Sequence, residues 1–179
     1  WPEVVYSMQH RIGLNCGKMV TGNMGSEMRM NYTMMGDTVN LAARLESSAK
    51  QYGVYNFVGE NIYEKTKREF VFRFLDFVKV KGKNIPVKVY ELVNSKNDID
   101  NKTLKLVQLF EKGLDKYYKK KWEDALTLFQ KSEEMEEKFT SRNTNPSLIY
   151  IERCKILLHM IDVTELDLVL SYKQIRNEL

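Results

Sequence analysis

The chain has 179 residues, 43% of them hydrophobic and 29% charged, with two Cys and a formal net charge of +4. This composition is typical of folded globular proteins and excludes a disordered or collagen-like chain, and the length suits one medium domain or two small ones. No apolar run approaches the ~20 residues that span a bilayer, and the N-terminal residues lack the charged start and apolar stretch of a signal peptide. Two distant Cys provide no disulfide framework, so we expect reduced thiols, a cytoplasmic location and no membrane insertion by this chain.

The positive charge lies in the first part of the chain. Residues 1–93 carry 13 Lys and Arg against 9 Asp and Glu, whereas residues 94–179 carry 15 of each kind. A mild positive excess suits a ligand that bears phosphate, although an ordinary solvated surface explains it equally well. The balanced second part argues against nucleic acid as a partner, because phosphate binding needs a positive excess.

Residues 94–102 are polar and turn-rich and predict a linker between two parts of different character, 1–93 and 103–179. The first part holds most of the Gly and Met and alternates strand and helix patterns. In chain order it predicts strand 11–16 paired with a strand after Gly17, helix 36–53, strand 55–58, helix 60–67, and a hairpin of strands 70–80 and 85–93. This order predicts an α+β layered domain.

Several residues of the first part have expected structural roles. Asp37 or Thr38 can cap the start of the helix, and Gly53 ends it. Pro86 near the start of the last strand favours an edge position, because Pro cannot donate to the ladder. A cluster of Met residues is expected to fill the core or a dimer interface: Met24, Met28, Met30, Met34 and Met35.

The most specific phrase of the sequence runs over residues 11–46. It holds an RIG strand, a Gly-Asn-Met-Gly turn at 22–25, the segment Tyr-x-x-x-Gly-Asp-x-Val-Asn and the triplet Ala-x-Arg. These motifs, in this order and spacing, resemble the central signature of the class III adenylate and guanylate cyclases. The resemblance covers residues 1–93, where the Lys-Gly turn of the family appears as Lys81-Gly82. It implies the C-terminal half of a ferredoxin-like cyclase domain.

Asn40 and Arg44 are four residues apart on the expected helix and therefore share a face. An amide beside a guanidinium can hold a sugar ring and a phosphoryl oxygen, and the guanidinium is a fixed fork of donors for charge on an α-phosphate. The resemblance implies that Asn40 orients the ribose and Arg44 stabilises the transition state. Taken alone, the pair would more often be a surface Arg and an incidental Asn.

The resemblance implies two further substrate contacts. Thr33 occupies the position that reads the purine edge, and a Thr hydroxyl that both donates and accepts suits adenine. Lys81 would neutralise the triphosphate as a point charge. The alternatives are a strand Thr without a ligand and a solvated turn Lys, which is the commoner case.

The family binds two Mg²⁺ or Mn²⁺ ions through two Asp residues, and neither phrase that carries them occurs in this sequence. We therefore expect the metal ligands upstream, and the chain begins as a fragment of a longer protein would. His10 and His159 are isolated, so they build neither a metal site nor a catalytic triad. Residues 22–27 lack the spacing of a phosphate-binding loop and are expected to form a turn.

The second part is patterned for helices at 103–119, 122–138, 147–161 and 164–177. It resembles a tetratricopeptide repeat, a helix pair of about 34 residues. The matching positions are Gly113, Trp122, Ala125, Phe129 and Ser132, with Ser147 opening the next helix. The alternative is any antiparallel helix hairpin with a Trp and Phe core. Isolated repeats bury little surface, so this part is expected to pack on the first part or on a second chain.

Two functional hypotheses follow. In the first, the chain is part of an adenylyl cyclase that converts ATP into cAMP and pyrophosphate at sites shared across a head-to-tail homodimer, and the isolated chain is inactive without the metal ligands. In the second, it is a regulatory or scaffold module whose helices dock a protein partner. The joint presence of Asn40 and Arg44 favours the first.

Overall fold

The computed structural model describes residues 5, 8–78, 86–137 and 143–161. The predicted turn that holds Lys81 and the predicted helix 164–177 lie outside these residues. The described elements are β1 (Ile12–Leu14), β2 (Val20–Ser26), β3 (Arg29–Met35), α2 (Asp37–Ala49), β4 (Asn56–Gly59), α3 (Glu60–Thr66), β5 (Phe70–Val78), β6 (Val87–Ser95), α4 (Asn101–Tyr118), α5 (Trp122–Glu133) and α6 (Pro146–Ile161). Within the described ranges, every helix is too short or too polar to cross a bilayer.

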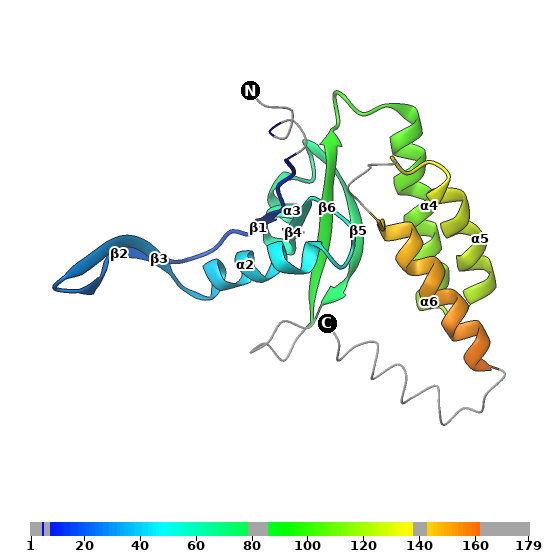
Figure 1. Ribbon diagram of the computed structural model, residues 1–179. Helices are drawn as coiled ribbons and strands as arrows, with labels where there is room; N and C mark the ends of the chain where they lie inside the picture. The colour runs from blue at the N-terminus through cyan, green and yellow to red at the C-terminus, as the bar shows by residue number, and fades with distance from the viewer. Residues whose placement is uncertain (1–4, 6–7, 79–85, 138–142, 162–179) are drawn as a thin grey trace.

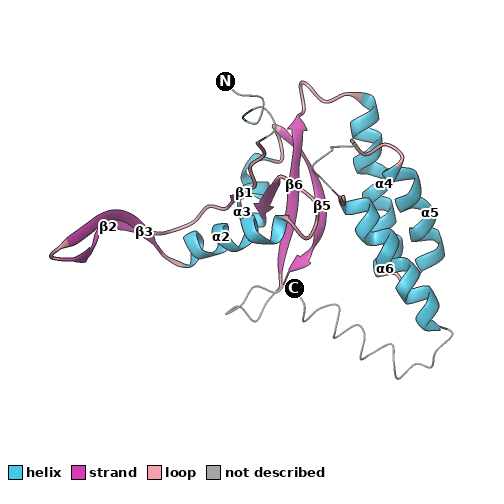
Figure 2. Ribbon diagram, viewed as in Figure 1, coloured by secondary structure: helices cyan, strands magenta, loops and turns pink. Residues whose placement is uncertain are grey.

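The central sheet has the strand order β1-β4-β6-β5 (Figure 2). β1 pairs in parallel with β4, and β6 pairs antiparallel with both β4 and β5. The predicted pairing of β1 with the strand after Gly17 is therefore wrong. The predicted edge position after Pro86 is also wrong, because β6 lies between two strands. Pro86 is tolerated because it precedes Val87, the first strand residue, where no ladder donor is needed.

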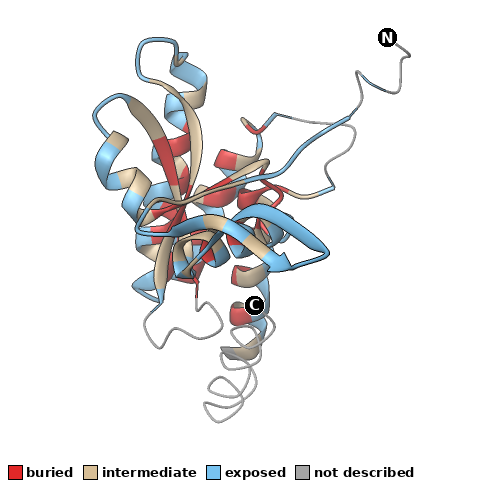
Figure 3. Ribbon diagram, turned by 90° about the vertical axis from the view of Figure 1, so that its left-hand side faces the viewer, coloured by how far each residue is buried: buried red, intermediate tan, exposed pale blue. Residues whose placement is uncertain are grey.

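Strands β2 and β3 form a separate antiparallel hairpin that projects from the rest of the molecule (Figure 1). The predicted turn at residues 22–27 is mostly strand, since the pairing extends to Ser26 and Arg29. Gly25 has φ +144°, and a Cβ there would lie 2.1 Å from the carbonyl oxygen of Arg29. The hairpin surface is largely exposed (Figure 3). Of the two expectations for the Met cluster, core packing is therefore wrong, because Met28 is 96% exposed and Met30 61%, whereas a dimer interface stays a prediction.

Helix α2 leads from the hairpin back to the sheet (Figure 1). Its N-cap is Gly36, and no side chain caps it, so the predicted capping role of Asp37 or Thr38 is wrong. Asp37 lies in the first turn, where the helix dipole favours a negative charge. The buried side of α2 consists of Leu41, Leu45 and Ala49, as the sequence pattern predicts.

Helices α4, α5 and α6 pack as neighbours beside β5, and Figure 1 shows them away from the hairpin. Asp100 caps α4 by accepting a hydrogen bond of 2.9 Å from the backbone N–H of Thr103. Gly113 of α4 lies against the ring of Phe129, and a Cβ at Gly113 would approach that ring to 2.7 Å. This close approach brings α4 and α5 together. Lys120 and Lys121 are exposed between the two helices, as expected.

The sheet and the helices share one hydrophobic core. It includes Leu45 of α2, Phe57 and Leu75 of the sheet, and Phe110 and Tyr150 of the helices. The segment predicted as a linker contains the end of β6 and the start of α4, which leaves only residues 96–100 between them. The expected packing of the second part on the first is therefore confirmed.

Trp122 is only 8% exposed, and Ala125 and Phe129 beside it are fully buried, as predicted. Truncating the Trp122 side chain should therefore destabilise the fold. Replacing Trp122 with Ala should cost about 3–5 kcal/mol and lower the melting temperature by roughly 10 °C. Thermal melting followed by helical circular dichroism measures this. The exposed neighbour variant Lys121→Ala is the control and should melt as the parent chain does. An unchanged melt of the Trp122 variant would show that this packing contributes nothing.

Candidate functional site

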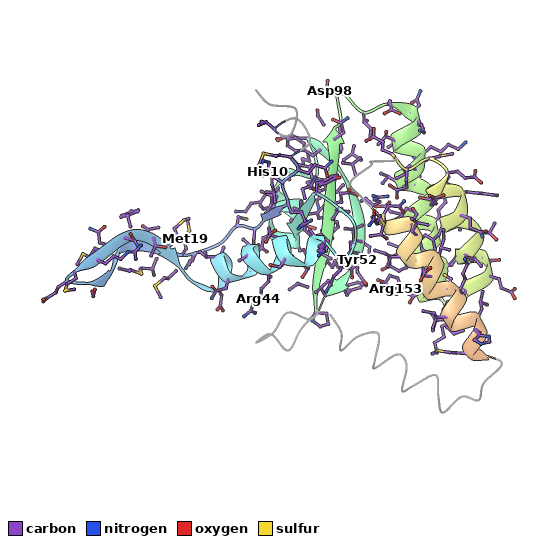
Figure 4. The ribbon with its side chains drawn as sticks, viewed as in Figure 1. His10, Met19, Arg44, Tyr52, Asp98 and Arg153 are labelled. Carbon is purple, nitrogen blue, oxygen red and sulfur yellow. The ribbon has the colours of Figure 1, made fainter. Side chains whose placement is uncertain are left out.

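The exposed side of α2 carries the two residues singled out by sequence. Asn40 and Arg44 are both exposed and lie one turn apart, ~6 Å along the helix axis. Leu41 and Leu45, each the next residue in sequence, lie about 100° further around the helix axis and are buried. Figure 4 shows Arg44 pointing away from the sheet. An amide and a guanidinium are thus exposed one turn apart on the same helix.

Strand β1 fixes the position of α2. A Cβ at Gly13 would lie 2.0 Å from the carbonyl oxygen of Ala42, so only Gly allows the helix to approach the strand this closely. Just after β1, the Asn15 side-chain amide donates a 3.0 Å hydrogen bond to the carbonyl oxygen of Thr38. Gly17 lies directly against Thr38, where a Cβ would clash with its hydroxyl oxygen. Gly13 and Gly17 are therefore needed for packing, because they leave room for helix α2, which carries Asn40.

Thr33 lies on a different element. It is exposed on β3, opposite Gly22 of β2. The hairpin that holds it projects from the N-terminal end of α2 (Figure 1). The structure therefore brings Asn40 and Arg44 together, while Thr33 occupies the neighbouring hairpin. Lys81 lies outside the described residues.

A two-metal centre does not fit the described part of the chain. It contains no group of three or more His, Cys, Asp or Glu side chains that could hold a metal ion. His10 and His159 are each exposed. No chemical step can therefore be assigned to a metal held by these residues.

Sequence reasoning missed a buried charged residue on β5. Arg73 is 3% exposed, and its Nε lies 2.7 Å from Glu91 of β6 while its Nη1 lies 2.5 Å from Glu136 beyond α5. Burial alone would lower the pKa of the Arg73 guanidinium, but the two carboxylates outweigh this effect and raise that pKa. The available signal was a charged residue inside the apolar run of 70–78.

Sequence reasoning also missed Asp76, the second charged residue of the apolar run 70–78. Its carboxylate accepts hydrogen bonds from Tyr52, Tyr118 and Arg153. Burial and, next, the negative charge of Asp76 raise the pKa of the Tyr52 hydroxyl well above its usual range. Tyr52 therefore stays protonated and donates to the carboxylate.

Comparison with known proteins assigns the first part of the chain. Residues 3–94 match the family model of the adenylate and guanylate cyclase catalytic domain. Adenylate cyclase 1 of Rhizobium meliloti is 39% identical over 83 residues, which are 46% of this chain and 12% of that protein. The crystal structure of the adenylyl cyclase CyaB from P. aeruginosa is 34% identical and covers 50% of this chain and 45% of that chain, with a TM-score of 0.43.

One similarity extends into the helices. The terminal-differentiation-specific adenylate cyclase of Dictyostelium discoideum is 35% identical over 168 residues, 90% of this chain and 8% of that protein. An alignment of this length reaches α4–α6, beyond the end of the family model. The chain spans only about a tenth of the length of these curated relatives. With half of its residues matched by the family model, the chain belongs to the family of adenylate and guanylate cyclase catalytic domains.

Proposed function

We propose that this chain is the part of an adenylyl cyclase that contributes Asn40 and Arg44 to the conversion of ATP into cAMP and pyrophosphate. The observation that carries the proposal is the exposed pair on α2, a helix that Gly13 allows to lie directly on β1. The relatives named adenylate cyclase support the reaction class.

In this reaction the 3′-hydroxyl group of ATP releases its proton as its oxygen attacks the α-phosphorus. A P–O bond forms, and the bond to the pyrophosphate oxygen breaks. Negative charge builds on the oxygens of the α-phosphate. The Arg44 guanidinium stabilises that charge with paired donors, and the Asn40 amide holds the ribose so that its hydroxyl faces the phosphorus. Mg²⁺ or Mn²⁺, which the family uses, would take its ligands from Asp residues upstream of this sequence.

Thr33 and Lys81 complete the proposed ATP site. The Thr33 hydroxyl can accept a hydrogen bond from the exocyclic amine of adenine, and its exposed position on β3 leaves it accessible. Lys81 would neutralise the triphosphate.

A homodimer is the proposed assembly, with each site shared between two chains in a head-to-tail arrangement. The projecting hairpin supports it, because Met28, Met30 and Tyr32 are each more than 60% exposed. Soluble monomers rarely leave large apolar side chains exposed together, and such surfaces mark interaction sites. A cytoplasmic location fits this role, with any membrane anchor upstream.

The second candidate function is a regulatory or scaffold module whose helices dock a protein partner. The packing of Gly113 on Phe129 favours a repeat-like helix pair, and Ser147, 34 residues after Gly113, lies in the first turn of α6. Ser147 is fully buried and lies 2.9 Å from Ser132 of α5, oxygen to oxygen. If a longer protein that contains this chain made no cAMP from ATP, that result would favour this alternative.

The first test removes the guanidinium. In a longer cyclase that contains this chain and the metal ligands, Arg44→Ala should lower kcat about 10²–10³-fold, the cost of losing one donor to transition-state charge. Steady-state cAMP production measures it. The exposed cation Lys50 at the end of the same helix provides the control Lys50→Ala, which should keep full activity. An unchanged kcat for Arg44→Ala would remove Arg44 from the chemistry.

The second test concerns the base. The same longer cyclase should prefer ATP to GTP in kcat/KM, and Thr33→Val, which keeps the shape and removes the hydroxyl, should reduce that preference about tenfold. Thr21→Val, an exposed Thr on the paired strand β2, is the matched control. Equal turnover of GTP by the unsubstituted enzyme would overturn the adenine assignment.

The third test uses the 179-residue chain by itself. It should form no detectable cAMP from ATP with Mg²⁺ or Mn²⁺, because the sequence lacks both Asp phrases that carry the metal ligands of the family, and the described residues contain no group of three or more His, Cys, Asp or Glu that could replace them. Chromatographic detection of cAMP after long incubation is the measurement. Steady turnover by the purified chain would show that the reaction needs no upstream ligands.

A further inference from the structure

The carboxylate of Asp76 connects three separate elements to β5. Its Oδ2 accepts a 2.7 Å hydrogen bond from the Tyr52 hydroxyl and lies 2.7 Å from Nη1 of Arg153. Its Oδ1 accepts a 2.9 Å hydrogen bond from the Tyr118 hydroxyl. Asp76 and Arg153 have side chains only 13% and 14% exposed, so solvent screens this pair weakly. A single carboxylate thus ties α4, α6 and the segment after α2 to the sheet.

Tyr52 belongs to the turn that ends α2. It is 1% exposed, and the turn is closed by a 3.1 Å hydrogen bond from the Val54 N–H to the Ala49 carbonyl oxygen. Gly53 has φ +62°, and a Cβ there would lie 2.2 Å from the carbonyl oxygen of Thr144, just before α6. The end of α2 therefore meets the helical part at two points: through Asp76 and directly at Gly53.

Arg153 of α6 also contacts two aromatic rings. Its guanidinium lies 4.8 Å from the ring centre of Tyr150 and 5.6 Å from that of Tyr52. The Tyr150 hydroxyl donates a 2.7 Å hydrogen bond to the carbonyl oxygen of Leu75. Leu75 falls at a register shift between β5 and β6, which leaves it without a cross-strand partner. Figure 4 shows Tyr52 and Arg153 close together between the end of α2 and α6.

Helix α2 is thus anchored at both ends, and Arg44 lies between the anchors. Asn15, just after β1, holds the first turn at Thr38, and Gly13 of β1 lies against the middle of the helix at Ala42. The Asp76 cluster holds the turn that follows Ala49. A helix of 13 residues is stiff, so a shift of its C-terminal turn moves the whole exposed face.

We propose that helices α4–α6 set the position of α2 through the chain Arg153–Asp76–Tyr52, which makes Arg153 and Tyr52 positioning residues for Asn40 and Arg44. The catalytic consequence rests on the proposed function, whereas the mechanical link between α6 and α2 does not.

The mechanical link is tested by hydrogen exchange of the 179-residue chain, followed by mass spectrometry of peptides. Tyr52→Phe and Tyr118→Phe each remove one hydroxyl from the same carboxylate, but only Tyr52 touches the end of α2. Tyr52→Phe should speed exchange of residues 44–54 about fivefold, whereas Tyr118→Phe should leave α2 within about twofold of the parent chain.

Substitution on α6 tests the link from a distance. Arg153→Met, which keeps the length of the stem and removes the charge, should also speed exchange of residues 44–54 about fivefold. Lys155→Met, at an exposed position of the same helix, is the control and should change nothing in α2. Faster exchange confined to α6, or an equal increase throughout the sheet, would overturn the proposal.

The catalytic consequence is tested in the longer cyclase. Arg153→Met should lower kcat about tenfold with a smaller change in KM for ATP, because a displaced Arg44 fails mainly in the transition state. Arg153→Lys, which keeps the charge, should restore part of kcat, and Lys155→Met should behave as the parent enzyme. If kcat is unchanged while α2 exchange rises, the positioning role is wrong. If the unsubstituted enzyme makes no cAMP, the proposed function fails and the exchange result still decides the link.

Discussion

Two charges on one strand constrain the whole molecule. Arg73 and Asp76 lie inside the apolar strand β5, and their partners include Glu136, which follows α5, and Arg153 of α6. Leaving one member of a buried ion pair without its partner costs about 3–5 kcal/mol, a large share of the stability of an ordinary domain. The helices therefore cannot separate from the sheet without leaving Arg73 and Asp76 without these ion-pair partners.

This constraint explains why the helices belong structurally to the cyclase part. The Tyr150 hydroxyl donates a hydrogen bond to the Leu75 carbonyl oxygen of β5. The Arg73 guanidinium lies over the Phe110 ring, 5.1 Å from the ring centre. The similarity to the Dictyostelium cyclase covers both parts of the chain, as expected if they form one structural unit. Under the proposed function, the helix that presents Asn40 and Arg44 is then supported directly by β1 and, through the turn at Tyr52 and Gly53, by the helical part.

Local patterns predicted much of this from the sequence. The α2 helix, its buried Leu41 and Leu45, and the helix stripe of Trp122 and Phe129 all follow from 3.6-residue periodicity. The pairing of β1 could not be predicted in this way, because its parallel partner β4 lies more than forty residues along the chain. The sequence left core packing and a dimer interface both open for the Met-rich hairpin, because apolar composition alone does not reveal whether a neighbouring surface covers it. The buried charges escaped prediction because Arg73 and Glu136 are 63 residues apart and Asp76 and Arg153 are 77 apart.

The central claim is that sheet and helices form one cooperative unit, and native-state hydrogen exchange at increasing denaturant concentration tests it most directly. The account predicts that the slowest amides of β6, α4 and α6 open with the same free energy and the same dependence on denaturant, since the buried charges join them. Helical amides that stay protected while β6 exchanges through a separate, lower-energy opening would contradict it.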